Sequence, residues 1–118
     1  LVMTGANNLL TGRTDFTETI RTITASLRQD YPEAVILVNS LIPFQVPGFG
    51  ERIQAVNIDL RAIASTAGAI YLDLYTPFEK AREPVFDFDG VHFSSFGYSL
   101  WARLLSSELR TLLAKDAD

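Results

Sequence analysis

Three short runs of apolar residues limit the possible folds of this chain more than any other feature. They occupy residues 1–4, 34–38 and 69–72. In each run the side chains fail to alternate between polar and apolar, which is typical of strands buried on both faces, as in parallel sheets. We therefore predict three buried strands.

Helices are predicted between the strands, because apolar residues recur there every three or four positions. The first helix is expected to begin at Thr14 or Asp15 as its cap and to end at Tyr31-Pro32, since the residue before proline disfavours helix. Gly68 is expected to end the second helix. Their apolar stripes are Phe16, Ile20, Ile23 and Leu27, and then Ile53, Val56, Leu60, Ile63 and Ala67.

A third helix is predicted after Ser94 or Ser95, either of which can cap it. A short helix is expected at 76–80, with Pro77 in its first turn. Residues 6–13 and 41–50 are predicted to be loops, and 81–91 to be irregular. The third helix is expected to bury Leu100, Trp101, Leu104, Leu105, Leu109 and Leu112.

Alternating strands and helices predict an α/β fold with a parallel sheet covered by helices. Three strands alone would leave two sheet edges open, and the chain starts with an apolar run. We therefore expect that strands and helices preceding residue 1 are missing.

Composition excludes several kinds of function. The net charge is −4 and no run of Lys or Arg occurs, so nothing favours nucleic-acid binding. The apolar runs are too short to span a membrane. The chain has no cysteine and a single histidine, so thiolate and multi-histidine metal sites are impossible within it. No metal or cofactor is expected, and the sequence assigns no cellular compartment.

Polar residues follow each predicted strand, at the sheet edge where α/β proteins bind ligands. Among them are Asp89 and His92, which flank Gly90 and Val91 in the last loop. An imidazole base oriented by a carboxylate can activate a serine hydroxyl, and His92 has no competitor as the base. The spacing alone is also compatible with a surface or helix-capping pair.

Other polar residues near these loops are weaker candidates. Asp87 could replace Asp89 as the acid, whereas Asp73 is expected to satisfy N–H groups of a loop or helix. Ser94 and Ser95 lie too close to His92 along the chain to serve comfortably as its nucleophile. Trp101 is expected in the core.

Residues 89–98, Asp89-Gly90-Val91-His92-Phe93-Ser94-Ser95-Phe96-Gly97-Tyr98, resemble the last conserved block of the SGNH (GDSL-like) serine ester hydrolases. That block reads Asp-Gly-x-His, small or polar residues, Gly-Tyr and an apolar helix. The resemblance implies that Asp89 is the acid and His92 the base of a catalytic triad.

An earlier segment, Val2-Met3-Thr4-Gly5-Ala6-Asn7-Asn8, resembles the strand and Gly-x-Asn-Asp turn of the same family. The resemblance implies that Asn7 donates a hydrogen bond to the oxyanion. Asn8 departs from the commoner Asp, which puts in doubt the hydrogen bonds that this Asp would make.

The family's Gly-Asp-Ser nucleophile block is absent from this chain. The resemblance implies that residues 1–118 are the C-terminal part of a single flavodoxin-like α/β/α domain, with the serine supplied by an N-terminal companion segment. The expected reaction is hydrolysis of a small acyl or acetyl ester, such as an acetylated carbohydrate, in a pocket that loop 41–50 helps to line. Alternatives are a lipid-ester or thioester hydrolase and a non-catalytic degenerate or split-chain interaction module.

Overall fold

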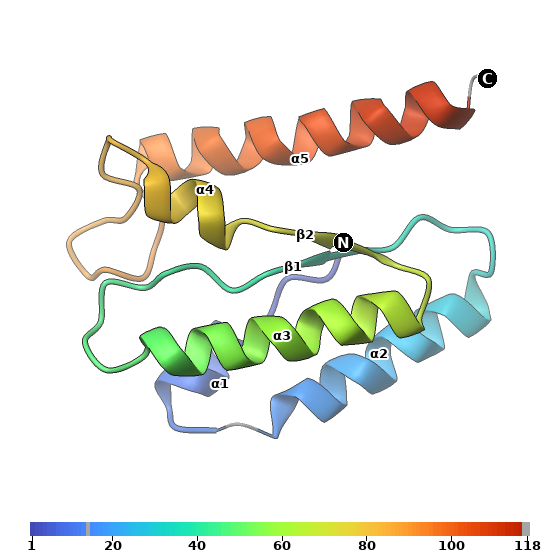
Figure 1. Cartoon of the computed structure of the whole chain (residues 1–118), viewed down its shortest axis with the longest axis horizontal. Helices are drawn as coiled ribbons and strands as arrows, with labels where there is room; N and C mark the ends of the chain where they lie inside the picture. Colours follow the sequence, from blue (N-terminus) through green and yellow to red (C-terminus); the bar gives the residue numbers. More distant parts are fainter. Residues whose placement is uncertain (14, 117–118) are drawn as a thin grey trace.

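A computed structural model describes residues 1–13 and 15–116 of the chain (Figure 1). The elements follow the predicted alternation of helices and strands. In chain order they are α1 (Ala6–Leu10), α2 (Phe16–Asp30), β1 (Leu37–Asn39), α3 (Gly50–Thr66), β2 (Ile70–Leu72), α4 (Tyr75–Lys80) and α5 (Ser95–Asp116).

The sheet is parallel, as predicted. β1 pairs with β2, with Val38 opposite Tyr71. On its other side β1 receives a parallel bridge from Val2, whose N–H donates to Leu37 O at 2.7 Å. Helices α2 and α3 lie on one face of the sheet and α5 on the other (Figure 1). The three-layer α/β arrangement is therefore confirmed.

The core lies mainly between the sheet and helices α2 and α3. Ile20 of α2 and Ile53, Leu60 and Ile63 of α3 are at most 2% exposed, as is Val38 of β1. The four helix side chains belong to the predicted stripes, since positions three or four apart share one face of a helix. The two predicted helices are confirmed, but Ile23 of the first predicted stripe is 41% exposed.

Arg28 of α2 binds backbone carbonyl groups at the end of α3 and in the segment before β1. Its guanidinium donates to Ala67 O and Gly68 O, both at 2.9 Å, and to Ala34 O at 2.8 Å. The last carbonyl groups of a helix lack partners within it, so a cation at this position satisfies them and complements the helix dipole. Arg28 thereby fixes the turn from α3 into β2 against the approach to β1.

The strands are shorter and less buried than predicted. In the first run only Val2 joins the sheet, while Leu1 and Met3 are 59% and 45% exposed. Val35 is 53% exposed and precedes β1, and Ile70 of β2 is only half-buried. The prediction of burial on both faces is wrong for these residues, because continuous apolar character reports composition and not what covers each face.

The predicted loop 6–13 is also wrong in part, since its first half forms α1. Gly5 precedes this helix at φ +112°, and a Cβ there would lie 2.6 Å from the Phe16 ring. Glycine is therefore required for the chain to turn closely over α2. Leu9 is fully buried and anchors α1 in the core.

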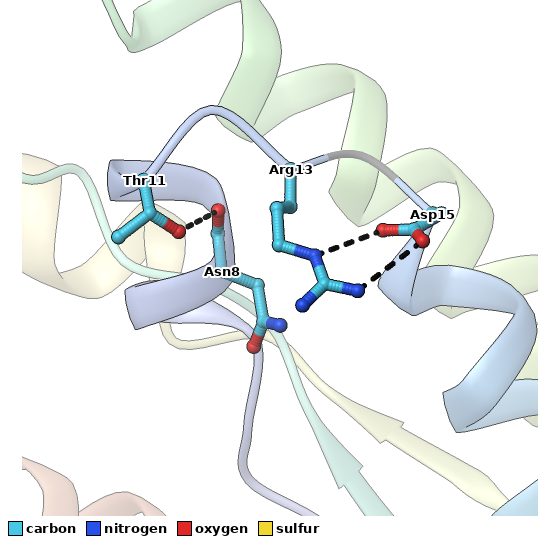
Figure 2. A network of polar contacts seen from close by, with 4 residues as sticks. All are labelled: Asn8, Thr11, Arg13 and Asp15. Atoms are coloured by element: carbon cyan, nitrogen blue, oxygen red, sulfur yellow. Dashed lines mark hydrogen bonds and ion pairs between the residues drawn. The ribbon is translucent and has the colours of Figure 1, made fainter.

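Figure 2 shows the connection from α1 to α2. Thr11 Oγ1 donates to Asn8 O at 3.0 Å, and the Arg13 guanidinium lies 3.4 Å from both carboxylate oxygens of Asp15. Asp15 is the residue before α2, but its side chain makes no cap hydrogen bond and pairs with Arg13 instead. The alternative cap, Thr14, lies outside the described residues.

The C-terminal half contains the predicted short helix as α4 and the predicted long helix as α5. Ser94 Oγ accepts the N–H of Gly97 at 3.0 Å, which confirms Ser94 as the cap of α5. Between these helices Phe86 and Phe93 form an antiparallel bridge. Leu109 of α5 is 42% exposed, so the apolar side of this helix is less buried than expected. No helix among the described residues has the length and apolar character needed to cross a membrane.

Candidate active site

Asp89 and His92 sit on a tight hairpin between Phe86 and Phe93. The N–H of Asp87 donates to His92 O at 2.8 Å, and the N–H of Gly90 donates to Asp87 O at 2.9 Å. Gly90 has φ +73°, a left-handed conformation that favours glycine. The segment predicted to be irregular is thus an ordered turn that brings Asp89 back beside His92.

The two side chains form a hydrogen-bonded pair. His92 Nδ1 and Asp89 Oδ2 are 2.5 Å apart. The other carboxylate oxygen, Oδ1, accepts the backbone N–H groups of Val91 and His92, each at 2.9 Å. Because the carboxylate holds the proton on Nδ1, Nε2 is left as the basic nitrogen. Nε2 is accessible, since the His92 side chain is 76% exposed.

Each member of the pair shifts the pKa of the other. The hydrogen bond from His92, followed by those from the Val91 and His92 backbone, lowers the pKa of Asp89 to about 2. The hydrogen bond to Asp89, and then the charges of Asp89 and Asp87, raise the pKa of His92 above its ordinary value. Asp89 therefore stays ionised across the physiological range.

These shifts predict a pH dependence. A general base works only when neutral, so kcat/KM for a His92-dependent reaction is expected to rise with pH around a midpoint above 6.5. Asp89→Asn removes the charge that raises the His92 pKa, so the midpoint is expected to fall. The measurement is a pH–rate profile of both proteins. An ascending limb at the same pH in both would contradict the coupling.

The same pair makes stability depend on pH in two windows. The raised His92 pKa stabilises the fold below about pH 6.5, and this contribution is lost as the pH rises through the folded-state value. The lowered Asp89 pKa stabilises the fold above about pH 4, and this contribution is lost as the pH falls toward 2.

A pocket of about 490 Å³ lies beside this pair, where the segments after Val2, β1 and the hairpin meet. It brings together Asn7 and His92, which are far apart in the sequence. Asp89 does not line it and contacts it only through its hydrogen bond to His92. The lining residues are Met3, Thr4, Gly5, Ala6, Asn7, Asn8, Ser40, Leu41, Ile42, Phe44, Val91, His92, Phe93, Tyr98 and Trp101.

Asn7 is exposed at the pocket in the first turn of α1. Its backbone carbonyl accepts the N–H and hydroxyl of Thr11, at 3.1 and 3.0 Å. Within the described part of the chain its side-chain amide makes no hydrogen bond, so the N–H donors are available to a ligand. Asn8 also lines the pocket, and its carbonyl is taken by Thr11.

Sequence reasoning missed one residue of this pocket, Ser40. Its side chain is 3% exposed, and Oγ accepts the N–H groups of Leu74 and Tyr75 at 2.9 and 3.1 Å. Ser40 thus holds the start of α4 and has no hydrogen bond to His92. Its place at the end of an apolar run was the only signal available in the sequence.

Among the weaker candidates, Asp73 and Ser94 have the structural roles predicted for them, whereas Trp101 differs from its prediction. Asp73 Oδ1 accepts the N–H of Thr76 at 3.1 Å, the structural role predicted for it. Ser94 caps α5, and Ser95 is exposed at its start. Trp101 is only half-buried and lines the pocket, so its assignment to the core is wrong in part. Across residues 1–13 and 15–116, no three His, Cys, Asp or Glu side chains cluster closely enough to hold a metal ion.

Comparison with known families agrees with these motifs. Residues 1–100 match the model of the GDSL-like Lipase/Acylhydrolase family. The chain belongs to this family. No curated protein sequence matches it significantly.

Solved structures show how much of a GDSL-like fold this chain covers. The esterase domain of the zebrafish ZfL2-1 ORF1 protein is 22% identical, with a TM-score of 0.69 over 92% of this chain and 61% of that one. A peptidoglycan O-acetylesterase is 20% identical, with a TM-score of 0.74 over 94% of this chain and 36% of that one. A GDSL-like lipase from Bacteroides thetaiotaomicron is 20% identical, with a TM-score of 0.67 over 92% and 60%. The chain thus spans about three fifths or less of each.

Proposed function

We propose that this chain carries the acid, the base and one oxyanion donor of a serine ester hydrolase. His92 takes the proton of the attacking serine and later returns it to the leaving group, while Asp89 orients His92 and stabilises its cation. Asn7 donates a hydrogen bond to the oxyanion of the tetrahedral intermediate. The observation that carries the proposal is the shared pocket, in which the amide of Asn7 and the imidazole of His92 face one space.

The nucleophilic serine comes, in this proposal, from an N-terminal segment of the same domain, of which residues 1–118 form the C-terminal part. Ser40, the serine of the pocket, already accepts two backbone N–H groups and has no hydrogen bond to His92 among the described residues. The short coverage of the solved relatives supports a further segment. So do the buried amide of Asn39 and indole N–H of Trp101, which have no hydrogen-bond partner among the described residues.

The substrate is a small acyl or acetyl ester, such as an acetylated carbohydrate. The pocket is large enough for a small acyl group with part of a sugar ring, and one structural neighbour is a peptidoglycan O-acetylesterase. The apolar walls Leu41, Ile42 and Phe44 of the predicted pocket loop also suit a lipid ester or thioester, which is the second candidate.

The test is turnover by the full-length protein. We expect hydrolysis of p-nitrophenyl acetate to exceed that of p-nitrophenyl octanoate, and acetate to be released from an O-acetylated sugar. A fluorophosphonate is expected to label one serine, which peptide mass mapping would place upstream of Leu1. The absence of both turnover and labelling would favour the non-catalytic interaction module.

Replacing Asn7 with alanine is expected to lower kcat by about 10²–10³, the usual cost of losing one oxyanion donor. Asn8→Ala is the matched control, because Asn8 also lines the pocket but its hydrogen bonds to Thr11 and Arg13 use its backbone carbonyl. We expect the control to retain kcat within about threefold. Equal losses in both variants would contradict the role of Asn7.

A further inference from the structure

The catalytic hairpin is attached to the rest of the molecule through Gly90. Gly90 O accepts the N–H of Gln45 at 2.9 Å, and a Cβ on Gly90 would lie 3.0 Å from Gln45 Cβ. Among the described residues, this is the one hydrogen bond that joins 87–92 to a segment outside the hairpin and its base. The Asp89 and His92 side chains are 37% and 76% exposed, so their position is set by this backbone contact and by the buried Phe86 and Phe93 at the base of the hairpin.

The other end of the Gln45 loop is held by Asn57, a buried residue of α3. Asn57 Oδ1 accepts the N–H of Leu41 at 2.7 Å, and Asn57 Nδ2 donates to Leu41 O at 3.1 Å. The Asn57 side chain thus holds both backbone polar groups of Leu41, in the manner of a strand neighbour. Without it the buried N–H of Leu41 would lose its only described partner.

The residues between these two attachment points, Leu41 and Gln45, are mostly buried. Ile42 and Phe44 are 6% and 8% exposed, and the N–H of Phe44 donates to Ile42 O at 2.9 Å. Because the buried side chains of Ile42 and Phe44 restrict how far this short segment can yield, a shift at Leu41 is passed on toward Gln45. Leu41, Ile42 and Phe44 also line the pocket beside His92.

We propose that Asn57 is a positioning residue, which acts through residues 41–45 and Gly90 to hold Asp89 and His92 at the pocket. This inference rests on the proposed function. Asn57 touches neither His92 nor the pocket beside it. Its role differs from a merely structural one because the hairpin it supports carries the base, and small displacements of a catalytic group reduce rates steeply.

The test is Asn57→Ala in the full-length protein. We expect kcat for p-nitrophenyl acetate to fall by about 10- to 100-fold. We also expect the midpoint of the ascending pH limb to move down toward about 6.5, because Gly90 lies between Asp89 and His92, and a turn released from Gln45 no longer holds the Asp89–His92 hydrogen bond that raises the His92 pKa. Ile20→Ala, a core truncation in α2, is the control for lost stability, and we expect it to leave the pH midpoint unchanged.

Gln45→Pro keeps the proposal testable if Asn57→Ala fails to fold. Gln45 is exposed, so proline there removes the N–H that binds Gly90 without truncating a core side chain. We expect the same loss of kcat and the same pH displacement. A wild-type kcat and pH midpoint in Gln45→Pro, or in a folded Asn57→Ala, would overturn the proposal. If His92→Ala were also fully active, the proposed function itself would be wrong.

Discussion

Replacing His92 with alanine in the full-length protein is expected to lower kcat for ester hydrolysis by about 10⁴-fold or more. Residues 1–118 contain one histidine, so no second imidazole within them can take over proton transfer. Losing the base of a serine triad removes both activation of the nucleophile and protonation of the leaving group. The residual rate would come from the oxyanion donors and from binding.

Two further variants separate the roles in this pair. Asp89→Asn is expected to lower kcat by about 10⁴, because an amide facing Nδ1 no longer selects the tautomer that leaves Nε2 basic. Asp87→Asn is the matched control, since Asp87 lies two residues away and makes no side-chain hydrogen bond to His92. The measurement is steady-state hydrolysis of p-nitrophenyl acetate. Wild-type turnover by His92→Ala would refute the hydrolase mechanism.

Replacing Gly97 with alanine is expected to destabilise the fold by about 3 kcal/mol and to lower Tm by roughly 10–15 °C. A Cβ on Gly97 would lie 2.1 Å from Val85 O and 3.2 Å from Phe93 Cβ. The first turn of α5 would therefore have to move away from the segment before the hairpin. That movement would break the Ser94 contacts to Val85 O and Pro84 O, at 3.0 and 2.6 Å.

Gly50→Ala is the control for the Gly97 variant. Both glycines lie in the first turn of a helix, but nothing lies within 4 Å of a Cβ on Gly50, and its φ is not in the left-handed region. We expect this variant to be neutral or slightly stabilising, because alanine loses less backbone entropy on folding. Thermal unfolding followed by circular dichroism measures both. If the two variants melted together, α5 would not approach Val85 as closely as the structure indicates.

Local signals were sufficient for most elements of the fold. The apolar stripes of α2, α3 and α5, the cap at Ser94 and the end of α3 at Gly68 depend on residues within a turn or two of one another. Helix α1 was missed because its apolar residues, Leu9 and Leu10, are too few to show a period. Its short length made it look like a polar loop.

The sequence alone was enough to single out the Asp89–His92 pair and the Asn7 segment, because each is a contiguous motif. Their shared pocket could not, since it depends on loops that are more than 80 residues apart in the chain. The roles of Ser40 and Asn57 could not be predicted from the sequence for the same reason. Each is an ordinary polar residue until the fold shows which distant backbone groups it holds.

For this chain, the sequence alone determined an α/β fold with a parallel sheet and its family, and it supplied the residues that we propose as acid, base and oxyanion donor. The periodicity of side chains and the spacing within motifs are properties of neighbouring residues. Tertiary structure alone decided that Asn7 and His92 share a pocket, that Leu1 and Met3 are exposed, and that Gln45 supports Gly90. Burial, pocket shape and backbone contacts between loops depend on how distant segments pack, which no local pattern encodes.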